Sequence, residues 1–340
     1  MMLVAAATAA GTIYFRTQQP YRGYAGTERF VDIPAGSSTR SIGDTLVTAG
    51  VVRDPLTFRL AALLSGQART LKAGEYRFDQ PMTPLEAIGK IARGDVYSIA
   101  VTFREGLTIA ETAAVFEQHG LGPASAFVAA ARDPTLVRKL DPAAPDLEGY
   151  LFPETYRLSR HTDAVTLVRT MVDRFGRVLS PELRRAAETR GLSIHQLVTL
   201  ASLVEKETAR ADERPIVAAV YLNRFRIGMP MQADPTVIFA LQQAGRYSGN
   251  LRRDDLQFDS PYNTYRYAGL PPGPIAAPGQ ASLEATVAPA DVDYLYFVSR
   301  NDGSHEFAET LAEHNRNVKT YQVDYFRAGG PGGAGRAGAK

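Results

Sequence analysis

The segment from Ile194 to Ala209 constrains the possible folds of this chain more than any other. If it forms a helix, at about 100° per residue, apolar side chains cover most of its circumference and leave only a narrow polar strip. A helix that is apolar on nearly every side has to be buried. The sequence therefore predicts a sizeable domain packed around this helix, which begins at a capping box formed by Ser193 and Gln196.

Two carboxylates project from apolar arcs of this predicted helix. Glu205 falls beside Val198, and Glu207 falls between Leu200 and Leu203. Burial in apolar surroundings raises the pKa of a carboxyl group, which would suit either residue to donate a proton near neutral pH. The alternative is a structural ion pair with a nearby arginine. Three arginines follow closely: Arg210, Arg214 and Arg224. The two carboxylates lie about 200° apart on the helix, which suggests that one is the proton donor and the other forms a structural ion pair. Periodicity does not say which residue has which role.

The composition describes an ordinary folded protein. Of the 340 residues, 45% are hydrophobic and 22% are charged, and the formal net charge is only +2. The sequence has no basic block that could neutralise a row of phosphates, so nucleic acid is not expected as a partner. The chain contains no Cys, which excludes disulfides, thiolate metal sites and a thiol nucleophile, and fits an exported protein.

The first residues suggest attachment to a membrane. Residues 2–15 carry no charge and are followed by Arg16 and a polar stretch. This apolar run is shorter than the roughly 20 residues that a bilayer span needs, and it lacks the basic start of a signal peptide. We interpret residues 1–20 as an incomplete, uncleaved membrane anchor. A cleaved signal peptide and a buried core helix are the alternatives.

From Arg29 to about Leu121 the sequence contains two related patterns at an offset of 70 residues. In each, alternating apolar residues lead into a glycine, Gly36 or Gly106, and then into a helical pattern, as expected for a strand, a turn and a helix. Thr108 and Glu111 have the spacing of a capping box at the second helix start. Such units are similar to the LysM modules that bind N-acetylglucosamine polymers, the alternative being an α+β spacer without a ligand.

Other helix starts are marked by capping residues. Thr83 and Thr310 are each followed three residues later by a glutamate, the spacing of a capping box. Asp212 is expected to cap the helix that follows the segment from Ile194 to Ala209. These signals predict helices both before and after the two carboxylates.

Several long motifs follow one another in the order seen in one known family. The run ASLVEKETARADERPIVAAVYLNRFRIGMPMQADPTVIFAL is followed by SPYNTYRYAGLPPGPIAAPGQASLEA, YLYFVSRNDGSHEF and EHNRNV. Upstream, LEGYLFPETY and LKAGEYRF extend the similarity toward the apolar N-terminus. These motifs closely resemble the endolytic murein transglycosylases, the YceG-like family of inner-membrane enzymes, over nearly the whole chain.

The resemblance implies a reaction and a catalytic residue. In that family the essential glutamate is the second of the EKE triplet, here Glu207, which leaves Glu205 a supporting role. The implied enzyme is a lyase that cuts the bond between N-acetylmuramic acid and N-acetylglucosamine and leaves a 1,6-anhydro end. One carboxyl group can serve both steps, first as acid and then as base. The implied biological role is termination of glycan elongation.

The resemblance also implies partners and a location. Glycan strands of peptidoglycan are the expected substrate, peptidoglycan synthases are candidate partners, and no cofactor or metal is expected. The expected arrangement is a single-pass protein of the bacterial inner membrane with its catalytic region in the periplasm. Two alternatives stay open: a non-catalytic cell-wall scaffold, and a hydrolytic muramidase with a second carboxylate facing the first. Candidates for that carboxylate are Glu148, Asp234 and Asp259.

Eight residues are candidates for substrate binding, because sugars are recognised by aromatic faces and planar hydrogen-bonding groups. They are Glu148, Gln232, Asp234, Thr236, Tyr262, Asn263, Thr264 and Tyr265. Asp234 could instead cap a helix, and the tyrosines could simply pack. His305 and His314 have no metal-ligand spacing and are interpreted as structural residues.

The predicted fold class is α+β: a small LysM-like α/β module, then a larger mixed α+β catalytic domain, with an N-terminal membrane anchor. Three prolines in residues 133–146 indicate a linker. The anchor is therefore followed by a LysM-like and linking region over residues 27–135 and a catalytic domain over residues 146–326. Residues 328–340 are rich in Gly, Ala and Pro and are expected to be a disordered tail.

Overall fold

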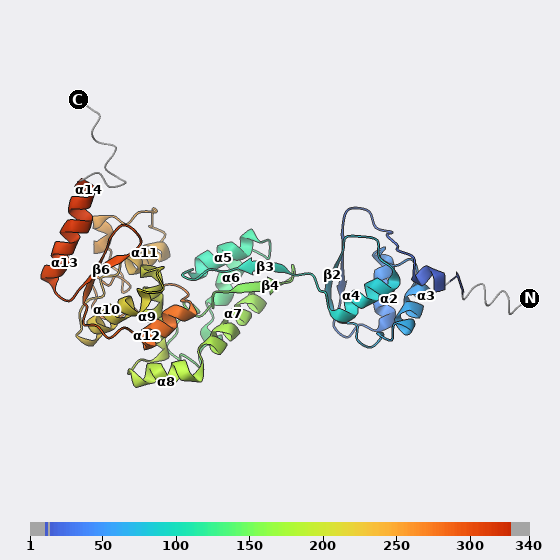
Figure 1. The fold of residues 1–340 in the computed structure, drawn as a ribbon, viewed down its shortest axis with the longest axis horizontal. Helices are drawn as coiled ribbons and strands as arrows, with labels where there is room; N and C mark the ends of the chain where they lie inside the picture. Colours follow the sequence, from blue (N-terminus) through green and yellow to red (C-terminus); the bar gives the residue numbers. More distant parts are fainter. Residues whose placement is uncertain (1–10, 13, 328–340) are drawn as a thin grey trace, which may run out of the picture. The chain divides into compact units, whose positions relative to one another are not determined.

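The chain divides into two compact units in the computed structural model, which describes residues 11, 12 and 14–327 (Figure 1). One unit comprises Met1–Ala100 and Arg157–Arg160, and the other comprises Val101–Tyr156 and His161–Lys340. This division differs from the boundary near residue 145 that the prolines suggested.

The segment predicted as a linker is packed into the second unit. Pro134–Leu136 form the short 3₁₀ helix η1, which Asp133 caps by accepting a hydrogen bond from the backbone of Thr135. Val137 and Asp141 beyond it are buried. The first of the three prolines thus lies in a tight local structure, and the domain boundary near residue 145 stays a prediction.

The first unit is built on one two-stranded sheet. Strand β1 (Arg29–Ile33) pairs antiparallel with β2 (Gly74–Phe78), so that Val31 lies opposite Tyr76 in the core. Its helices are α2 (Thr39–Thr48), α3 (Pro55–Leu64) and α4 (Pro84–Arg93). The predicted capping box at Thr83 is formed at the start of α4. That this unit is a LysM-like module, and that it binds glycan, stay predictions.

The repeated sequence pattern corresponds to repeated local structure. Strand β3 (Ile99–Thr102) and helix α5 (Ile109–Gln118) each begin 70 residues after β1 and α2. The turns carry Gly36 and Gly106, whose φ angles of 79° and 76° lie in the left-handed region that favours glycine. The predicted order of strand, turn and helix is thus confirmed in both places. The pairing differs, since β1 pairs with β2 whereas β3 pairs with β4 (Thr155–Leu158).

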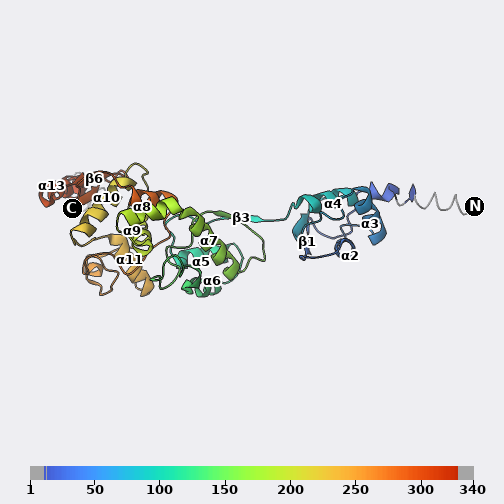
Figure 2. The same cartoon turned by 90° about the horizontal axis from the view of Figure 1, so that it is seen from below.

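Helix α9 (Ile194–Glu207) lies at the centre of the second unit, where α8, α10 and α11 (Figure 2) and α12 (Figure 1) pack around it. Its eight residues from 197 to 204 are all buried, which confirms the prediction from their apolar pattern. Besides α5, the helical elements described in this unit are α6 (Ala124–Ala131), α7 (Ala164–Val178), α8 (Pro181–Thr189), α10 (Arg214–Arg226), α11 (Asp234–Gln243), η2 (Arg253–Gln257), α12 (Gln280–Val287), α13 (Leu311–Val318), the π-helix η3 (Lys319–Asp324) and α14 (Tyr325–Arg327).

A short hairpin completes the second unit. Strands β5 (Tyr296–Ser299) and β6 (His305–Ala308) pair antiparallel, and α13 contacts both of them. The capping box predicted at Thr310 is formed at the start of α13. Helices and small sheets together confirm the α+β class.

The predicted anchor and tail fall largely outside the described residues. Residues 1–10, 13 and 328–340 are not among them, so the anchor and the disordered tail stay predictions. Among residues 11, 12 and 14–327, no helix has the length and apolar character needed to cross a bilayer.

Candidate active site

Glu207 is the last residue of α9, a position that favours its neutral form. The helix begins at the predicted capping box of Ser193 and Gln196 and ends because Thr208 adopts an extended backbone, with φ −138° and ψ 132°. The negative end of the helix dipole lies at this end, where a carboxylate is disfavoured relative to the acid. Helix α9 therefore brings Glu207 out of the core at a place where a proton on its carboxyl is stabilised.

The half-buried Glu207 lines a cavity of about 320 Å³. The side chains around the cavity belong to Glu207, Arg224, Met231, Gln232, Asp234, Tyr265, Phe297 and His314. The buried hydroxyl of Tyr221, on α10, donates a hydrogen bond to Glu207 Oε1 at 2.7 Å. This bond fixes the orientation of the carboxyl group. The described part of the chain has no group of three or more His, Asp or Glu residues that could hold a metal ion.

Burial raises the pKa of Glu207 from its ordinary value of 4.5 to about 7. The Tyr221 hydrogen bond and the positive charges of His305 and Arg224 lower the pKa, whereas the negative charge of Asp234 raises it. A large fraction of Glu207 is therefore protonated near neutral pH. A general acid needs this property, which a carboxyl in water lacks.

Arg224 lines the cavity, but its guanidinium N–H groups donate hydrogen bonds to backbone carbonyl groups. Its guanidinium donates to Leu295 O and to Met231 O, each at 2.6 Å, and to Pro230 O at 3.3 Å. Arg224 thereby ties α10 to the chain before β5 and to the loop before α11. The expected alternative, an ion pair between this arginine and a carboxylate of α9, is not among the interactions of the described residues.

Three predicted substrate-binding residues, Gln232, Asp234 and Tyr265, line the cavity together with Glu207. The Tyr265 hydroxyl donates to Asp234 Oδ1 at 2.6 Å. Gln232 has a φ of 51°, and such strained backbone clusters at functional sites. Asp234 does not cap α11, because Ala233 holds the cap position and no side-chain cap bond is formed. The capping alternative for Asp234 is therefore wrong.

Three other candidates support the cavity from within the core. The hydroxyls of Thr236 and Thr264 lie 2.9 Å apart, and Thr264 Oγ1 accepts a hydrogen bond from the backbone of Ala233 at 3.0 Å. Asn263 donates to two carbonyl groups of the preceding segment at 3.0 and 2.8 Å. All three side chains are at most 1% exposed. They join the two segments that carry Gln232 and Tyr265.

Tyr262 and Glu148 are not among the residues that line the Glu207 cavity. The Tyr262 ring packs against Phe239, with ring centroids 4.9 Å apart. The buried carboxyl group of Glu148 accepts hydrogen bonds from the backbone of Ile109, at the start of α5, at 3.2 and 3.1 Å. Of the three candidates for a second carboxylate, only Asp234 lies on the cavity, since Asp259 does not line it either.

We expect Glu148→Gln to flatten the pH dependence of stability. Burial raises the pKa of Glu148 from 4.5 to about 8 in the folded chain, so the free energy of unfolding falls as pH rises through that interval. Glutamine keeps an acceptor for Ile109 and removes the titration. Urea unfolding at about pH 5 and about pH 8 should show a decline of a few kcal/mol in the wild type and a smaller one in the variant. Equal declines would contradict this assignment.

Glu205 occupies the opposite arc of α9 and is held in a structural network. Its Oε2 accepts hydrogen bonds from the backbone of Gly279 at 2.9 Å and from Ser282 Oγ at 2.7 Å. Its Oε1 lies 3.6 Å from Arg214 Nη2, and the Glu205 side chain is 6% exposed. Glu205 therefore forms the structural ion pair expected for one of the two carboxylates, whereas Glu207 is the one that lines the cavity.

Several lining and supporting residues were not predicted from the sequence, Tyr221, Met231, Phe297 and His314 among them. His314 was interpreted as a hydrogen-bonding structural residue, yet its buried Nδ1 has no hydrogen-bond partner among the described residues. Burial lowers the pKa of His314, and its ring stacks on Tyr296 with centroids 5.2 Å apart. Tyr221 could have been predicted in the same way as the two glutamates, because it is a polar side chain on an otherwise apolar helix face.

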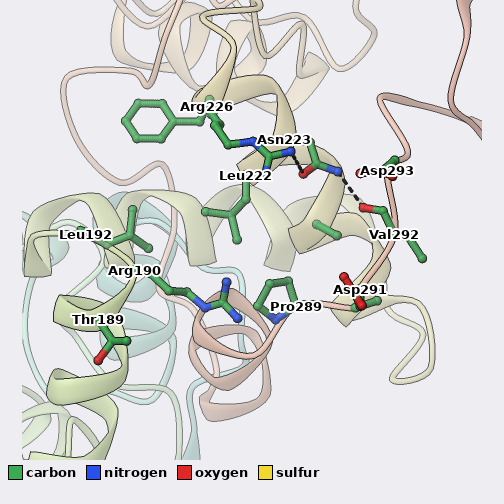
Figure 3. A pocket seen from close by; sticks show the side chains of 14 residues that line it. Thr189, Arg190, Leu192, Leu222, Asn223, Arg226, Pro289, Asp291, Val292 and Asp293 are labelled. Carbon is green, nitrogen blue, oxygen red and sulfur yellow. Dashed lines mark hydrogen bonds between the residues drawn. The ribbon is translucent and has the colours of Figure 1, made fainter.

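A second cavity, of about 660 Å³, lies on a different face of α10 and does not include Glu207 (Figure 3). Asn223, on its lining, donates hydrogen bonds to Val292 O at 2.9 Å and to Tyr294 O at 3.1 Å. These bonds fix the chain that leads into β5 and to Phe297. The second cavity contains none of the predicted site residues, and its lining has no residue in common with that of the Glu207 cavity.

Comparison with known proteins agrees with the motifs. The YceG-like family matches residues 31–320. A Bacillus subtilis protein named endolytic murein transglycosylase is 32% identical over 307 residues, which are 86% of this chain and 84% of that protein. A Streptococcus pneumoniae protein of the same name is also 32% identical, over 85% of this chain and 57% of its own length. A crystal structure of a YceG-like protein from Listeria monocytogenes matches with a TM-score of 0.58 at 30% identity, covering 86% of this chain and 100% of that one. The chain therefore belongs to the YceG-like family.

Proposed function

We propose that this protein is an endolytic murein transglycosylase, a lyase that cuts the glycan strands of peptidoglycan with Glu207 as its catalytic acid. The observation that carries the proposal is the Glu207 carboxyl, which has a pKa of about 7 and is oriented by Tyr221 at the edge of a cavity. The names of the two relatives support the reaction class.

In the proposed reaction Glu207 acts twice. Its proton passes to the glycosidic oxygen, and the bond between that oxygen and C1 of N-acetylmuramic acid breaks. The oxygen of the muramic 6-hydroxyl then bonds to C1, and the hydroxyl proton returns to the Glu207 carboxylate. The products are a 1,6-anhydro end and a free 4-hydroxyl on N-acetylglucosamine. A pKa near 7 suits both halves of this cycle, because acid and conjugate base are then both populated near neutral pH.

The rest of the cavity offers groups that fit this reaction. Gln232 and Tyr265 supply hydrogen-bonding groups, and Phe297 supplies an apolar face. The carboxylate of Asp234 would stabilise the positive charge that develops at C1 as the bond breaks. The unpartnered Nδ1 of His314 is a further group that can bind a substrate hydroxyl.

Hydrolysis is the second candidate reaction, and the position of Asp234 favours it. A muramidase needs a second carboxylate across the sugar from the acid, and Asp234 lines the cavity with Glu207. Water would then attack C1, and the new ends would be reducing ends instead of anhydro ends. Mass spectrometry of the ends released from cell-wall sacculi separates the two reactions.

Asp234→Asn is expected to slow the lyase by about 10- to 100-fold while leaving its products as anhydro ends, because Asn removes a charge that stabilises the transition state. Loss of this negative charge also lowers the pKa of Glu207, so the high-pH limit of activity should move to lower pH. Initial rates between about pH 5 and pH 9 measure that limit. Reducing ends in the wild type that vanish in Asp234→Asn would instead assign the water-activating base to Asp234.

We further propose that the enzyme acts at the inner membrane, with its catalytic region in the periplasm, and ends glycan strands as synthases extend them. The uncharged residues 2–15 and the family resemblance support this part of the proposal. Longer glycan strands in cells that lack the protein would agree with it, and unchanged strand lengths would oppose it.

A further inference from the structure

Glu213 joins the ends of three elements that surround Glu207. Its buried carboxylate accepts hydrogen bonds from the backbone N–H of His305 at 3.0 Å and from His305 Nδ1 at 2.7 Å. The Thr208 hydroxyl donates to the same carboxylate at 3.3 Å, and Arg210 Nε lies 3.5 Å from it. Thr208 follows α9, Glu213 precedes α10, and His305 begins β6. One carboxylate thus holds together the elements that carry Glu207, Tyr221 and the hairpin.

The connection continues from His305 to Glu207 through aromatic rings. The His305 ring packs edge-on against Phe297, with centroids 5.4 Å apart. Phe297 lines the Glu207 cavity and packs edge-on against Tyr221, with centroids 6.0 Å apart. Tyr221 in turn donates its hydroxyl proton to Glu207 Oε1 at 2.7 Å. The path from Glu213 to Glu207 is therefore continuous, and every step of it is a direct contact.

We propose that Glu213 and His305 form a positioning pair for the catalytic acid. Glu213 holds the His305 ring, and that ring keeps Phe297 and Tyr221 where they align the Glu207 carboxyl. Neither Glu213 nor His305 lines the cavity, so both act through other residues. The inference rests on the proposed function of Glu207 and adds two residues to its machinery.

The chemistry of the pair explains why a carboxylate is needed at residue 213. A carboxylate can only accept, so His305 Nδ1 carries a proton and donates it, which fixes the orientation of the ring. An amide at this position would offer donors as well and would release the ring from a single orientation. The positive charge of His305 also lowers the pKa of Glu207 and so opposes the effect of burial.

Several other charged or titratable groups face Glu207, and the replacement of His305 removes none of them. They are Tyr221 and Arg224 on α10, Asp234 at the start of α11, Tyr265 in the loop before α12, and His314 on α13. A change in the titration of Glu207 on replacing His305 can therefore be assigned to His305 itself or to the alignment that it maintains.

The test compares Glu213→Gln, His305→Asn and the control Glu306→Gln in the full chain. Glu306 is the next residue on β6, and its carboxylate contacts Arg300 and Tyr321. We expect kcat on purified glycan strands to fall by about 100-fold in the first two variants, since a small misplacement of a catalytic group has effects of that size. KM should change little, because the pair does not touch the substrate. The control should keep both constants.

Two further readouts separate positioning from a merely structural role. In His305→Asn the high-pH limit of activity should move to higher pH, because loss of the positive charge raises the pKa of Glu207. The ¹³C resonance of the Glu207 carboxyl can be assigned by comparison with Glu207→Gln. Its titration should report the same rise in the pKa of Glu207 without any substrate. Asparagine can still donate a hydrogen bond to Glu213. His305→Asn therefore tests the positioning role of the pair even if Glu213→Gln does not fold.

An unchanged kcat in a folded His305→Asn variant, or an unchanged titration of Glu207, would overturn the inference. So would a loss of activity that follows only the fraction of folded protein. Failure of the proposed function looks different: the wild type itself would make no new chain ends, while the carboxyl titration would still report on the pair.

Discussion

Glu207→Gln is expected to reduce glycan cleavage by about 1000-fold or more, because proton donation by a positioned general acid contributes factors of about 10² to 10⁴. Glutamine can still accept the hydrogen bond from Tyr221, so the cavity should keep its shape. The amide has no acidic proton to give to the glycosidic oxygen. Glu207 must begin each cycle protonated, and its pKa is about 7. The activity of the wild type should therefore fall about tenfold per pH unit above that pKa.

The measurement is the initial rate of release of new chain ends from purified sacculi. Glu188→Gln, an exposed carboxylate on α8, is the matched control and should cleave at the wild-type rate. A Glu207→Gln variant that still cleaves within tenfold of the wild type, with the same pH profile, would remove Glu207 from the role of acid.

Glu205→Ala is expected to lower the free energy of unfolding by about 3–5 kcal/mol, the effect of removing one partner from a buried ion pair. The change leaves the backbone N–H of Gly279 and the hydroxyl of Ser282 without their acceptor. It also leaves Arg214, whose side chain is only 13% exposed, with the more exposed Glu105 carboxylate at 3.7 Å as its remaining charged neighbour. Helix α9 would lose the polar contacts that Glu205 makes with α10 and α12.

Urea unfolding measures this loss of stability, and Glu205→Gln is the variant with which Glu205→Ala is compared. Glutamine keeps an acceptor for Gly279 and Ser282 but loses the charge, so its loss of stability should be smaller. At temperatures where both variants are folded, they should still cleave glycan. A stable Glu205→Ala variant without activity would exchange the roles assigned to the two glutamates of α9.

Local structure followed closely from the sequence because it depends on interactions between near neighbours. The capping boxes expected at Thr83, Thr108, Ser193 and Thr310 are all formed, since each needs only two side chains three residues apart. Asp212 was expected to cap α10 and does not. It pairs with Arg210 at 2.7 Å, and Glu213 takes the cap position while its carboxylate bonds to His305.

The candidate site followed from the sequence only in part. Periodicity placed Glu205 and Glu207 on apolar arcs but left them equivalent, because their difference lies in distant partners. Glu205 is distinguished by Gly279 and Ser282, some 75 residues away, and these contacts form only when α12 packs against α9.

The opposite wall of the cavity depends on tertiary contacts in the same way. Phe297 and His314 reach it through the β5–β6 hairpin and α13, whose packing no local pattern specifies. The prolines in residues 133–146 do not by themselves distinguish a linker from a short 3₁₀ helix such as Pro134–Leu136, because both can have the same composition.

The identity of the new chain ends decides whether this protein is a lyase with Glu207 as its acid. Sacculi are digested with the wild-type enzyme and with Glu207→Gln, and the released muropeptides are identified by mass spectrometry. We expect 1,6-anhydro-N-acetylmuramic acid ends with the wild type and almost none with the variant. Reducing N-acetylmuramic acid ends, or anhydro ends that persist in Glu207→Gln, would contradict this expectation.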